Sequence, residues 1–376
     1  MSACVGLLLC EFVSRLVLNP ADFLKLEVVP NDVLGAVPSP SAMGGFDRWG
    51  FRNRKVPETA DIVAVGDSHT YGNTAKMDES WPYVLGRLTG RQVYNMGLGG
   101  YGPNQYFYLS STEALSLKPR IIIWGLYMGD DFENAFSITY GLDHWAYLRE
   151  LPPQKVDANI WDAPESDSAG WNKRIRVWLS RHSVLYQLVF HFGFAGKLQG
   201  EAQIRNAAQL YSGLAASLIV PEKNILEAFR PKSMLTRLDQ QNPDIREGMR
   251  VTFELMTEMK RICRQNNVQF LVVVIPTKEM VFSDYLEHNS KLALTDVFDN
   301  LIANERLARG QTFKFLTDSG IPYVDPLPAL KGSVEHELYA RTAADMHPSK
   351  NGYAVIAGAV SEALKQRDTN PATSSH

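Results

Sequence analysis

The chain has 376 residues, 45% of them hydrophobic and 21% charged, so it can bury one large core, or one core with a sizeable insertion. The formal net charge of -3 gives no global attraction to polyanions, and we find no long basic run, which argues against nucleic acid as a partner. The three cysteines, Cys4, Cys10 and Cys263, lack the spacing of a zinc site and imply no disulfide framework.

Residues 1–57 are interpreted as an apolar N-terminal segment and an extended lead-in. Residues 5–9 and 12–18 are apolar but are interrupted by Glu11 and Arg15, whereas a membrane-spanning helix needs about 20 largely apolar residues. A secretory signal would also carry a basic region before the apolar run and a small-residue cleavage site after it. Membrane association through this segment, a cell-envelope location and a cytoplasmic protein with the segment packed on its domain all stay open. Residues 19–57 contain many Pro, Gly, Asn and Ser residues, which predicts extended chain without regular structure.

Short apolar runs alternate with helical stretches from residue 58 onward. The first run, residues 61–65, ends at Gly66 and is typical of a buried parallel strand that leads into a loop. The alternation predicts βαβ units and a parallel sheet. The other predicted strands are residues 92–96, 120–126, 270–275 and 321–324, and residues 245–265 and 353–364 are predicted helices.

The alternation stops between about residues 132 and 243, where tryptophans, prolines and helical patches replace it. The helical patches are residues 174–194 and 202–218. We therefore expect a mostly helical insertion within a main domain of residues 58–366. The polar tail, residues 367–376, contains Pro, Ser and Thr and is predicted to be disordered.

Ser68 stands two residues after the glycine that ends the first strand, so its hydroxyl is expected at the C-terminal edge of the sheet, where open α/β folds bind ligands. A serine hydroxyl needs a base to remove its proton, and the base needs a partner that fixes its tautomer. His347 has the best neighbourhood of the eight histidines, because it lies in a loop before the final helix with Asp345 two residues upstream. This spacing can bring a carboxylate to the imidazole ring.

Four blocks resemble, in order, those of SGNH/GDSL hydrolases: Gly66-Asp67-Ser68, the glycine-rich loop of residues 95–102, Gly129-Asp130-Asp131, and Asp345-Met346-His347. The resemblance spans residues 61–364. It implies a three-layer α/β/α fold with a parallel sheet of about five strands in flavodoxin-like order. It also implies a serine esterase with Ser68 as nucleophile, His347 as base and Asp345 as the residue that orients the base. This chemistry requires no metal and no organic cofactor.

In this family the oxyanion hole uses the serine N–H, a glycine N–H and an asparagine side chain. By position these are Ser68, Gly100 (with Gly99 as the alternative) and Asp130, which stands where the family has asparagine. An ionised carboxylate only accepts hydrogen bonds and would repel an oxyanion. A protonated Asp130, a contribution from Asn134 or weak activity would each account for this departure. The second departure is the short Asp345 to His347 spacing, which also occurs in the family.

Several residues near these blocks are candidates for substrate contact. Lys278 follows the fourth strand and is expected either to face the substrate or to be a solvated loop lysine. His69 is expected in a pocket wall or at the surface, because neighbouring side chains on an extended loop diverge. Asp67, Asp131 and Asn134 complete this group of candidates.

Other functions compete with the esterase. Asp67-Ser68-His69 together with Gly129-Asp130-Asp131 also resembles the first metal-ligand blocks of calcineurin-like metallophosphoesterases, although no later Gly-Asn-His or Gly-His-x-His block follows. A glycan-binding relative silenced by Asp130 is a third class. Residues 97–102 match a dinucleotide fingerprint, but Pro103 follows at once and no acidic residue ends a strand about 20 residues later. The resemblance suggests an O-acetylated glycan as substrate, with either water or a sugar as acyl acceptor.

Overall fold

The computed structural model describes residues 2–39, 46–154, 156, 171–190, 194–211, 213–341 and 345–369. Its centre is a five-stranded parallel sheet in the order β4-β3-β5-β8-β9, which is 2-1-3-4-5 in chain order. The predicted flavodoxin-like order is therefore confirmed. The strands are β3 (Ile62–Gly66), β4 (Val93–Gly97), β5 (Ile121–Tyr127), β8 (Gln269–Ile275) and β9 (Tyr323–Val324).

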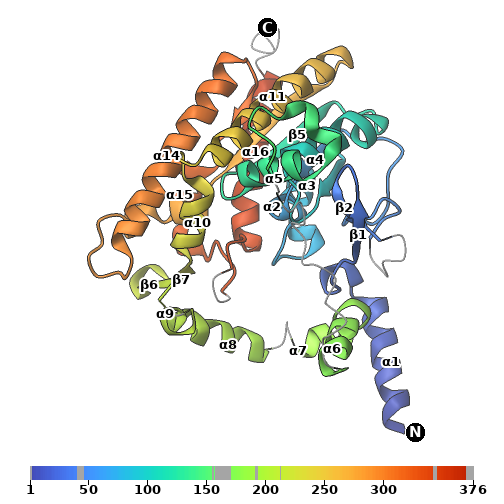
Figure 1. Ribbon diagram of the computed structural model, residues 1–376. Coiled ribbons are helices and arrows are strands. Elements are labelled where there is room, and N and C mark those ends of the chain that lie inside the picture. Colours follow the sequence, from blue (N-terminus) through green and yellow to red (C-terminus); the bar gives the residue numbers. More distant parts are fainter. Residues whose placement is uncertain are drawn as a thin grey trace.

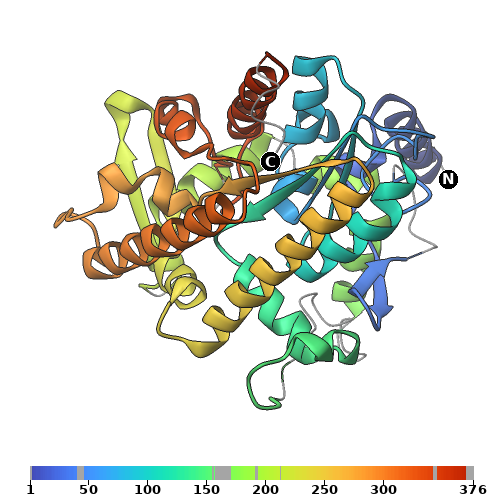
Figure 2. The same ribbon diagram turned by 90° about the horizontal axis from the view of Figure 1, so that it is seen from above.

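Both faces of the sheet are covered by helices, which gives the expected three layers (Figure 2). Because side chains alternate along a strand, Ile62 and Val63 of β3 enter two different core clusters. The Ile62 face packs against α3 (Trp81–Thr89) and α16 (Lys350–Thr369). The opposite face packs against three helices: α4 (Pro103–Leu109), α5 (Asp131–Gly141) and α11 (Pro243–Gln265).

The later helices surround the β8–β9 side of the sheet. The longest, α14 (Thr295–Asp318), contributes side chains to both core clusters. Next to it lies α10 (Pro231–Leu238), and short helices follow β8 and β9 at the C-terminal edge. These short helices are α12 (Lys278–Val281), α13 (Ser283–Leu286) and α15 (Leu327–Lys331).

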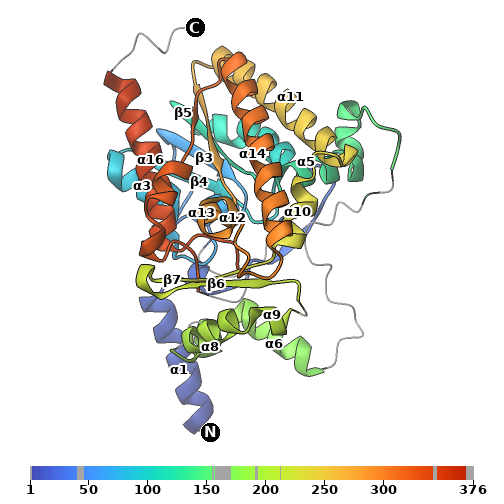
Figure 3. The same cartoon turned by 90° about the vertical axis from the view of Figure 1, so that its left-hand side faces the viewer.

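Residues of the predicted insertion form a layer beside the C-terminal edge of the sheet (Figures 1 and 3). The layer contains the helices α6 (Trp171–His182), α7 (Val184–Phe190), α8 (Phe194–Arg205) and α9 (Ala207–Leu210). The predicted helical patch 202–218 is wrong at its end, because β6 (Ala216–Val220) pairs there with β7 (Ile225–Phe229). Asn224 closes this hairpin in the left-handed conformation. Ile225 and Phe229 of β7 join the core of the main domain, and Leu226 and Ala228 on its other face pack within the insertion.

The lead-in is more regular than its composition predicts. The chain begins with α1 (Ser2–Val17), and β1 (Val28–Asn31) pairs with β2 (Gly35–Pro38) in an antiparallel hairpin. None of the described helices has the length and apolar character needed to cross a membrane. At the other terminus α16 runs to Thr369, so the predicted disordered tail is wrong for residues 367–369, and residues 370–376 lie outside the described residues.

Thr70 fixes the short helix α2 (Ser68–Tyr71) on the two central strands. Its buried side chain lies against Gly66 of β3 and Gly125 of β5, where a β-carbon on either glycine would overlap the Thr70 side chain. Gly66 at the end of β3 and Gly125 within the adjacent β5 therefore allow the turn after β3 to approach the sheet closely.

We expect Gly125→Ala to lower the free energy of unfolding by about 1–3 kcal/mol, because the added methyl group overpacks the contact with Thr70. Urea denaturation measures the change. Gly310→Ala is the matched control, since Gly310 lies in α14 with open space around it and alanine there should stabilise the helix by about 0.5–1 kcal/mol. Equal stability of the Gly125 variant and the wild type would contradict this packing.

Candidate active site

Ser68, His347 and Asp345 form a continuous hydrogen-bonded chain at the C-terminal edge of the sheet. The Ser68 Oγ lies 2.8 Å from His347 Nε2, and His347 Nδ1 lies 2.7 Å from Asp345 Oδ1. The backbone N–H of His347 also donates to Asp345 Oδ1 at 2.9 Å, so a spacing of two residues is sufficient to fold the carboxylate onto the ring. The structure thus brings together the three residues that the sequence pairs, in the geometry of a nucleophile, a base and an orienting acid.

Local hydrogen bonds explain why Ser68 occupies this position. Asp67 caps α2 by accepting the backbone N–H of His69 at 2.8 Å, which makes Ser68 the first residue of the helix. The helix ends after one turn at Gly72, whose φ of 88° is left-handed. The serine is therefore held between the end of β3 and a tight turn.

The loop that follows α2 is fastened to the loop that carries the histidine. Thr74 Oγ1 donates to the Pro348 carbonyl at 2.7 Å, and the Tyr353 hydroxyl donates to the Asn73 carbonyl at 2.9 Å. The buried Arg52 of the lead-in donates to the Gly72 carbonyl at 2.9 Å. The distance between serine and histidine thus depends on hydrogen bonds from segments far apart in the sequence.

The electrostatics of His347 suit a general base near neutral pH. Burial alone would lower the pKa of the ring, but the hydrogen bond and charge of Asp345, with the charges of Asp67 and Asp130, raise it above its ordinary value. The same contact with His347 outweighs burial at Asp345 and lowers the pKa of that carboxyl. Asp345 is therefore ionised at neutral pH and can stabilise an imidazolium.

Asp67 and His69 form a second, buried pair beside Ser68. Burial lowers the pKa of His69, so the ring is neutral at pH 7 and its Nδ1–H donates to Asp67 Oδ2 at 3.0 Å. The ring stacks on Tyr127 with centroids 3.7 Å apart, and Asp67 Oδ2 lies 3.3 Å from the Ser68 Oγ. Both side chains are buried by neighbouring protein groups, so the structure gives no support to the suggested substrate contact for either.

The backbone N–H groups of Ser68, Gly99 and Gly100 have no hydrogen-bond partner in the described part of the chain. A β-carbon on Gly99 would lie 3.6 Å from the Ser68 Cβ, which places this loop directly against the nucleophile. Gly100 has φ of 76°, a conformation that favours glycine. These unpaired donors are what an oxyanion hole requires.

Asp130 stands at the start of α5, where the family pattern has asparagine. Its side chain is 26% exposed, with Oδ2 lying 3.5 Å from Arg237 and Oδ1 buried without a hydrogen-bond partner among the described residues. Burial and the charge of Asp67 raise the pKa of Asp130 to about 7, against the opposing effect of Arg237. A substantial fraction of the carboxyl is therefore protonated at neutral pH and carries an O–H that can donate.

Asp131 is fully buried and held by two donors, the Tyr106 hydroxyl at 2.9 Å and the Tyr127 backbone N–H at 2.8 Å. Burial, followed by the charges of Asp67 and Asp130, raises its pKa well above the ordinary range. This side chain braces the turn between β5 and α5, and its burial leaves no route to substrate.

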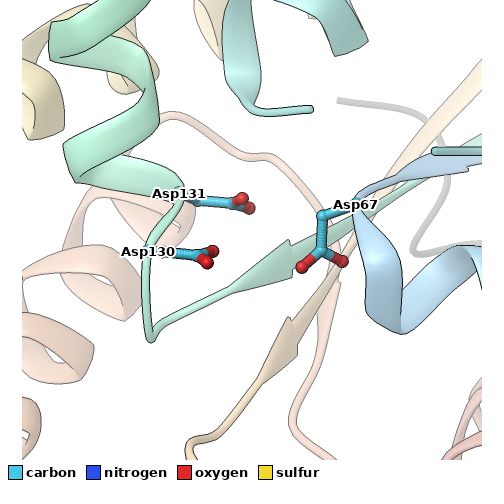
Figure 4. A group of neighbouring side chains, drawn as sticks. All are labelled: Asp67, Asp130 and Asp131. Carbon is cyan, nitrogen blue, oxygen red and sulfur yellow. The ribbon is translucent and has the colours of Figure 1, made fainter. Parts of the chain in front are cut away.

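Figure 4 shows Asp67, Asp130 and Asp131 facing one another across the edge of the sheet. One carboxylate oxygen from each lies within 4.8 Å of the others, and no histidine or cysteine joins this group within the described ranges. Asp67 already binds His69, and both Asp131 oxygens accept hydrogen bonds, so these two carboxylates have partners without a metal. A proton shared among the three carboxyl groups reduces the electrostatic repulsion between them.

Two asparagines lie near the loops that surround the proposed site. Asn134 of α5 is buried against the glycine-rich loop, since a β-carbon on Gly102 would overlap the Asn134 Cβ. Asn73 was missed in the sequence, although its Nδ2 lies 3.4 Å from His347 Nε2. Its position five residues after Ser68 was the available signal, because the one-turn helix α2 leads directly into that loop.

A cavity of about 540 Å³ lies beside the serine and histidine. Asn73 and Gly99 line the end next to His347 and Ser68. Its remaining walls come from the segment after α1, from Arg52 and from two neighbouring loops. These residues are Ala21, Asp22, Leu24, Lys25, Leu26, Arg52, Tyr71, Thr74, Ala75 and Leu98.

Lys278 is neither a solvated lysine nor a substrate contact, so both expectations are wrong. Its side chain is 1% exposed because β7 covers it, and its Nζ forms an ion pair with the equally buried Glu227. The Nζ also donates to the Ala228 carbonyl at 3.2 Å and to the Asp345 carbonyl at 3.4 Å. Lys278 thus ties the hairpin of the insertion to the loop that carries Asp345.

Comparison with known proteins adds a low-level structural similarity. No protein-family model and no curated protein sequence gives a significant match to this chain. Among solved structures, phospholipase A1 from Streptomyces albidoflavus is 10% identical, with 82% of this chain and 99% of that chain covered and a TM-score of 0.39. A GDSL-like lipase from Bacteroides thetaiotaomicron is also 10% identical, with coverage of 83% and 92% and a TM-score of 0.36. At these TM-scores the site has to be interpreted from its own geometry.

We expect Lys278→Met to lower the free energy of unfolding by about 3–5 kcal/mol, because Glu227 would be left as an unpaired buried charge. Urea denaturation of the single variants and of Lys278→Met/Glu227→Leu tests the pairing. The double variant should recover most of the loss, since both charges are removed together. If Lys278→Met/Glu227→Leu is as unstable as Lys278→Met, the contribution of Lys278 to stability does not come from its ion pair with Glu227.

Proposed function

We propose that this protein hydrolyses carboxylic esters through a covalent acyl-serine intermediate. The observation that carries the proposal is the hydrogen-bonded chain from Ser68 through His347 to Asp345. Ser68 Oγ attacks the ester carbonyl while His347 takes its proton, and His347 then gives that proton to the departing alkoxide. Water, deprotonated by His347, attacks the acyl-serine and releases the carboxylic acid, which regenerates Ser68.

Oxyanion stabilisation is assigned to the N–H groups of Ser68 and of Gly100, with Gly99 as the alternative, together with the protonated carboxyl of Asp130. A neutral carboxylic acid donates one hydrogen bond, as an asparagine amide would, and burial is a known means of keeping a carboxyl neutral. The unpartnered, buried Oδ1 of Asp130 supports this assignment. Asn73 is a second candidate donor because its amide lies next to His347.

Within this class, an O-acetylated carbohydrate is the proposed substrate, following the family resemblance, with water or a sugar hydroxyl as the acyl acceptor. The cavity beside Ser68 supports a substrate with polar groups, because charged and amide side chains (Asp22, Lys25, Arg52 and Asn73) line it. An esterase and an acetyltransferase would use the same three residues and differ only in what attacks the acyl-serine.

A metal-dependent phosphoesterase is the alternative favoured by the proximity of Asp67, Asp130 and Asp131. Turnover of p-nitrophenyl acetate and p-nitrophenyl phosphate by the wild type and Ser68→Ala, each with and without EDTA, separates the two functions. The esterase predicts acetate turnover that EDTA does not change and that Ser68→Ala reduces by at least about 1,000-fold. Phosphate turnover that survives Ser68→Ala and disappears with EDTA would establish the metal enzyme, and inactivity in every assay would favour a glycan-binding protein.

The pH dependence of kcat/KM should be bell-shaped with a maximum near neutral pH. On the acidic limb, activity rises with pH as His347, whose pKa is raised above its ordinary value, loses its proton. On the alkaline limb, activity falls as Asp130, with a pKa of about 7, loses its proton. Because the two groups interact, the two limbs report apparent values of the pair. Asp130→Asn should remove the alkaline limb, since an amide donates at every pH, while keeping the acidic limb.

The variant Asp130→Ala is the control for this profile. It removes the donor and should lower kcat by about 100 to 1,000-fold across the whole pH range. An Asp130→Asn profile that keeps its alkaline limb would show that another group sets that limb. If Asp130→Ala retains full activity, Asp130 has no part in oxyanion binding.

A further inference from the structure

The N-terminal helix α1 presents most of its apolar side chains to the outside of the molecule. It projects away from the main body (Figures 1 and 3) and packs against α7 (Figure 1). Eight of its apolar side chains are between 48% and 76% exposed. They are Val5, Leu7, Leu8, Leu9, Phe12, Val13, Leu16 and Val17. Such a large, contiguous apolar surface is unusual on a protein that meets only water.

The two charged residues of α1 do not solvate this surface, because both are used to attach the helix. Glu11 accepts the backbone N–H groups of Val184 and Leu185, both at 3.0 Å, and so caps the start of α7. Arg15 binds Glu11 at 2.7 Å and donates to the His182 carbonyl at 2.7 Å. Glu11 and Arg15, which interrupt the apolar pattern in the sequence, therefore fix α1 to the end of α6 and the start of α7. The other faces of α1 remain apolar.

Helix α6 is joined to α1 through the contact of Arg15 with the His182 carbonyl, and its sequence adds positive charge. Trp171, Ile175 and Trp178 are spaced to lie on one face of the helix, and all three are exposed, Trp171 at 76% and Trp178 at 58%. The sequence of α6 contains four lysine and arginine residues and no acidic one, although the whole chain has a net charge of -3. Exposed tryptophans beside basic residues are characteristic of helices that lie at a membrane interface.

We propose that α1 and α6 together form a docking surface for an anionic lipid bilayer, with the apolar side chains of α1 and the two tryptophans entering the interfacial region. The positive charge of α6 indicates that the partner is an anionic bilayer, because anionic headgroups attract a basic helix. The interior of the same bilayer accepts the apolar side chains. This assignment goes beyond ester hydrolysis and does not depend on it.

The position of this surface relates it to the proposed active site. The Lys25 backbone N–H donates to the Ser180 carbonyl of α6 at 3.1 Å, and Lys25 also lines the cavity beside Ser68. The segment that connects α1 to the body is thus a wall of the cavity. The proposed docking surface is therefore attached directly to a segment that lines the cavity.

Vesicle co-sedimentation of the full chain tests the proposal, using vesicles of phosphatidylcholine alone and of an equal mixture of phosphatidylcholine and phosphatidylglycerol. The wild type should bind the anionic vesicles at least about tenfold more tightly, and 0.5 M NaCl should weaken this binding. Trp171→Ser/Trp178→Ser and Arg176→Glu should each reduce binding about tenfold or more. Leu307→Ser, an exposed leucine on α14, is the matched control and should bind as the wild type does.

Failure of the wild type to sediment with anionic vesicles, or equal binding by the tryptophan variant, would overturn the docking surface. A dimer in solution that is dissociated by Trp171→Ser/Trp178→Ser, without vesicle binding, would assign the surface to a second copy of the chain and also overturn the proposal. Turnover of p-nitrophenyl acetate by the same variants should equal that of the wild type. That measurement separates a failure of lipid binding from a failure of the proposed esterase.

Discussion

The contact between Ser68 Oγ and His347 Nε2 is the interaction on which the rest of the site depends. It joins residues 279 positions apart in the sequence and brings the last loop of the domain to the end of the first core strand. Each side of the contact has its own support. Thr70 packs against two strand glycines below the serine, and Asp345 and the Thr74 to Pro348 hydrogen bond hold the histidine. An error of about 1 Å at either side would separate the proposed nucleophile from the proposed base, and misplacements of that size can lower the rate of an enzyme about 100-fold.

The unusual chemistry of this site lies in its carboxyl groups. Asp67, Asp130 and Asp131 converge within a few ångströms next to His347, and burial raises the pKa of Asp130 and Asp131. Asp131 and Asp67 are held by internal hydrogen bonds, so Asp130 remains as the member with an unpartnered oxygen. A protonated carboxyl at Asp130 could donate a hydrogen bond, which is what the proposed oxyanion site requires.

The insertion contributes to the site as well as to the surface. Through Glu227 its hairpin neutralises Lys278, which in turn contacts the Asp345 carbonyl, so the insertion supports the acid of the proposed catalytic chain. At the other end of the same layer, α6 and α7 hold α1 through Glu11 and Arg15. One layer therefore contacts both the apolar N-terminal helix and the loop that carries Asp345 and His347.

By itself the sequence determined the central fold and the candidates for chemistry, because strand periodicity, the glycines at strand ends and the spacing of short motifs are local signals. Local patterns predicted the five strands, and the spacing of short motifs predicted Ser68, His347 and Asp345, whereas the strand order was implied by the family resemblance. Only the tertiary structure decided which polar groups are buried and which groups they contact. Lys278 appears in the sequence as a loop lysine, yet a hairpin of the insertion buries it, and Asn73 reaches His347 only through the fold. Glu11 and Arg15 likewise appear to interrupt an apolar helix, and only the packing of α1 on α7 turns them into its attachment, since pairing of charges is a property of neighbours in space.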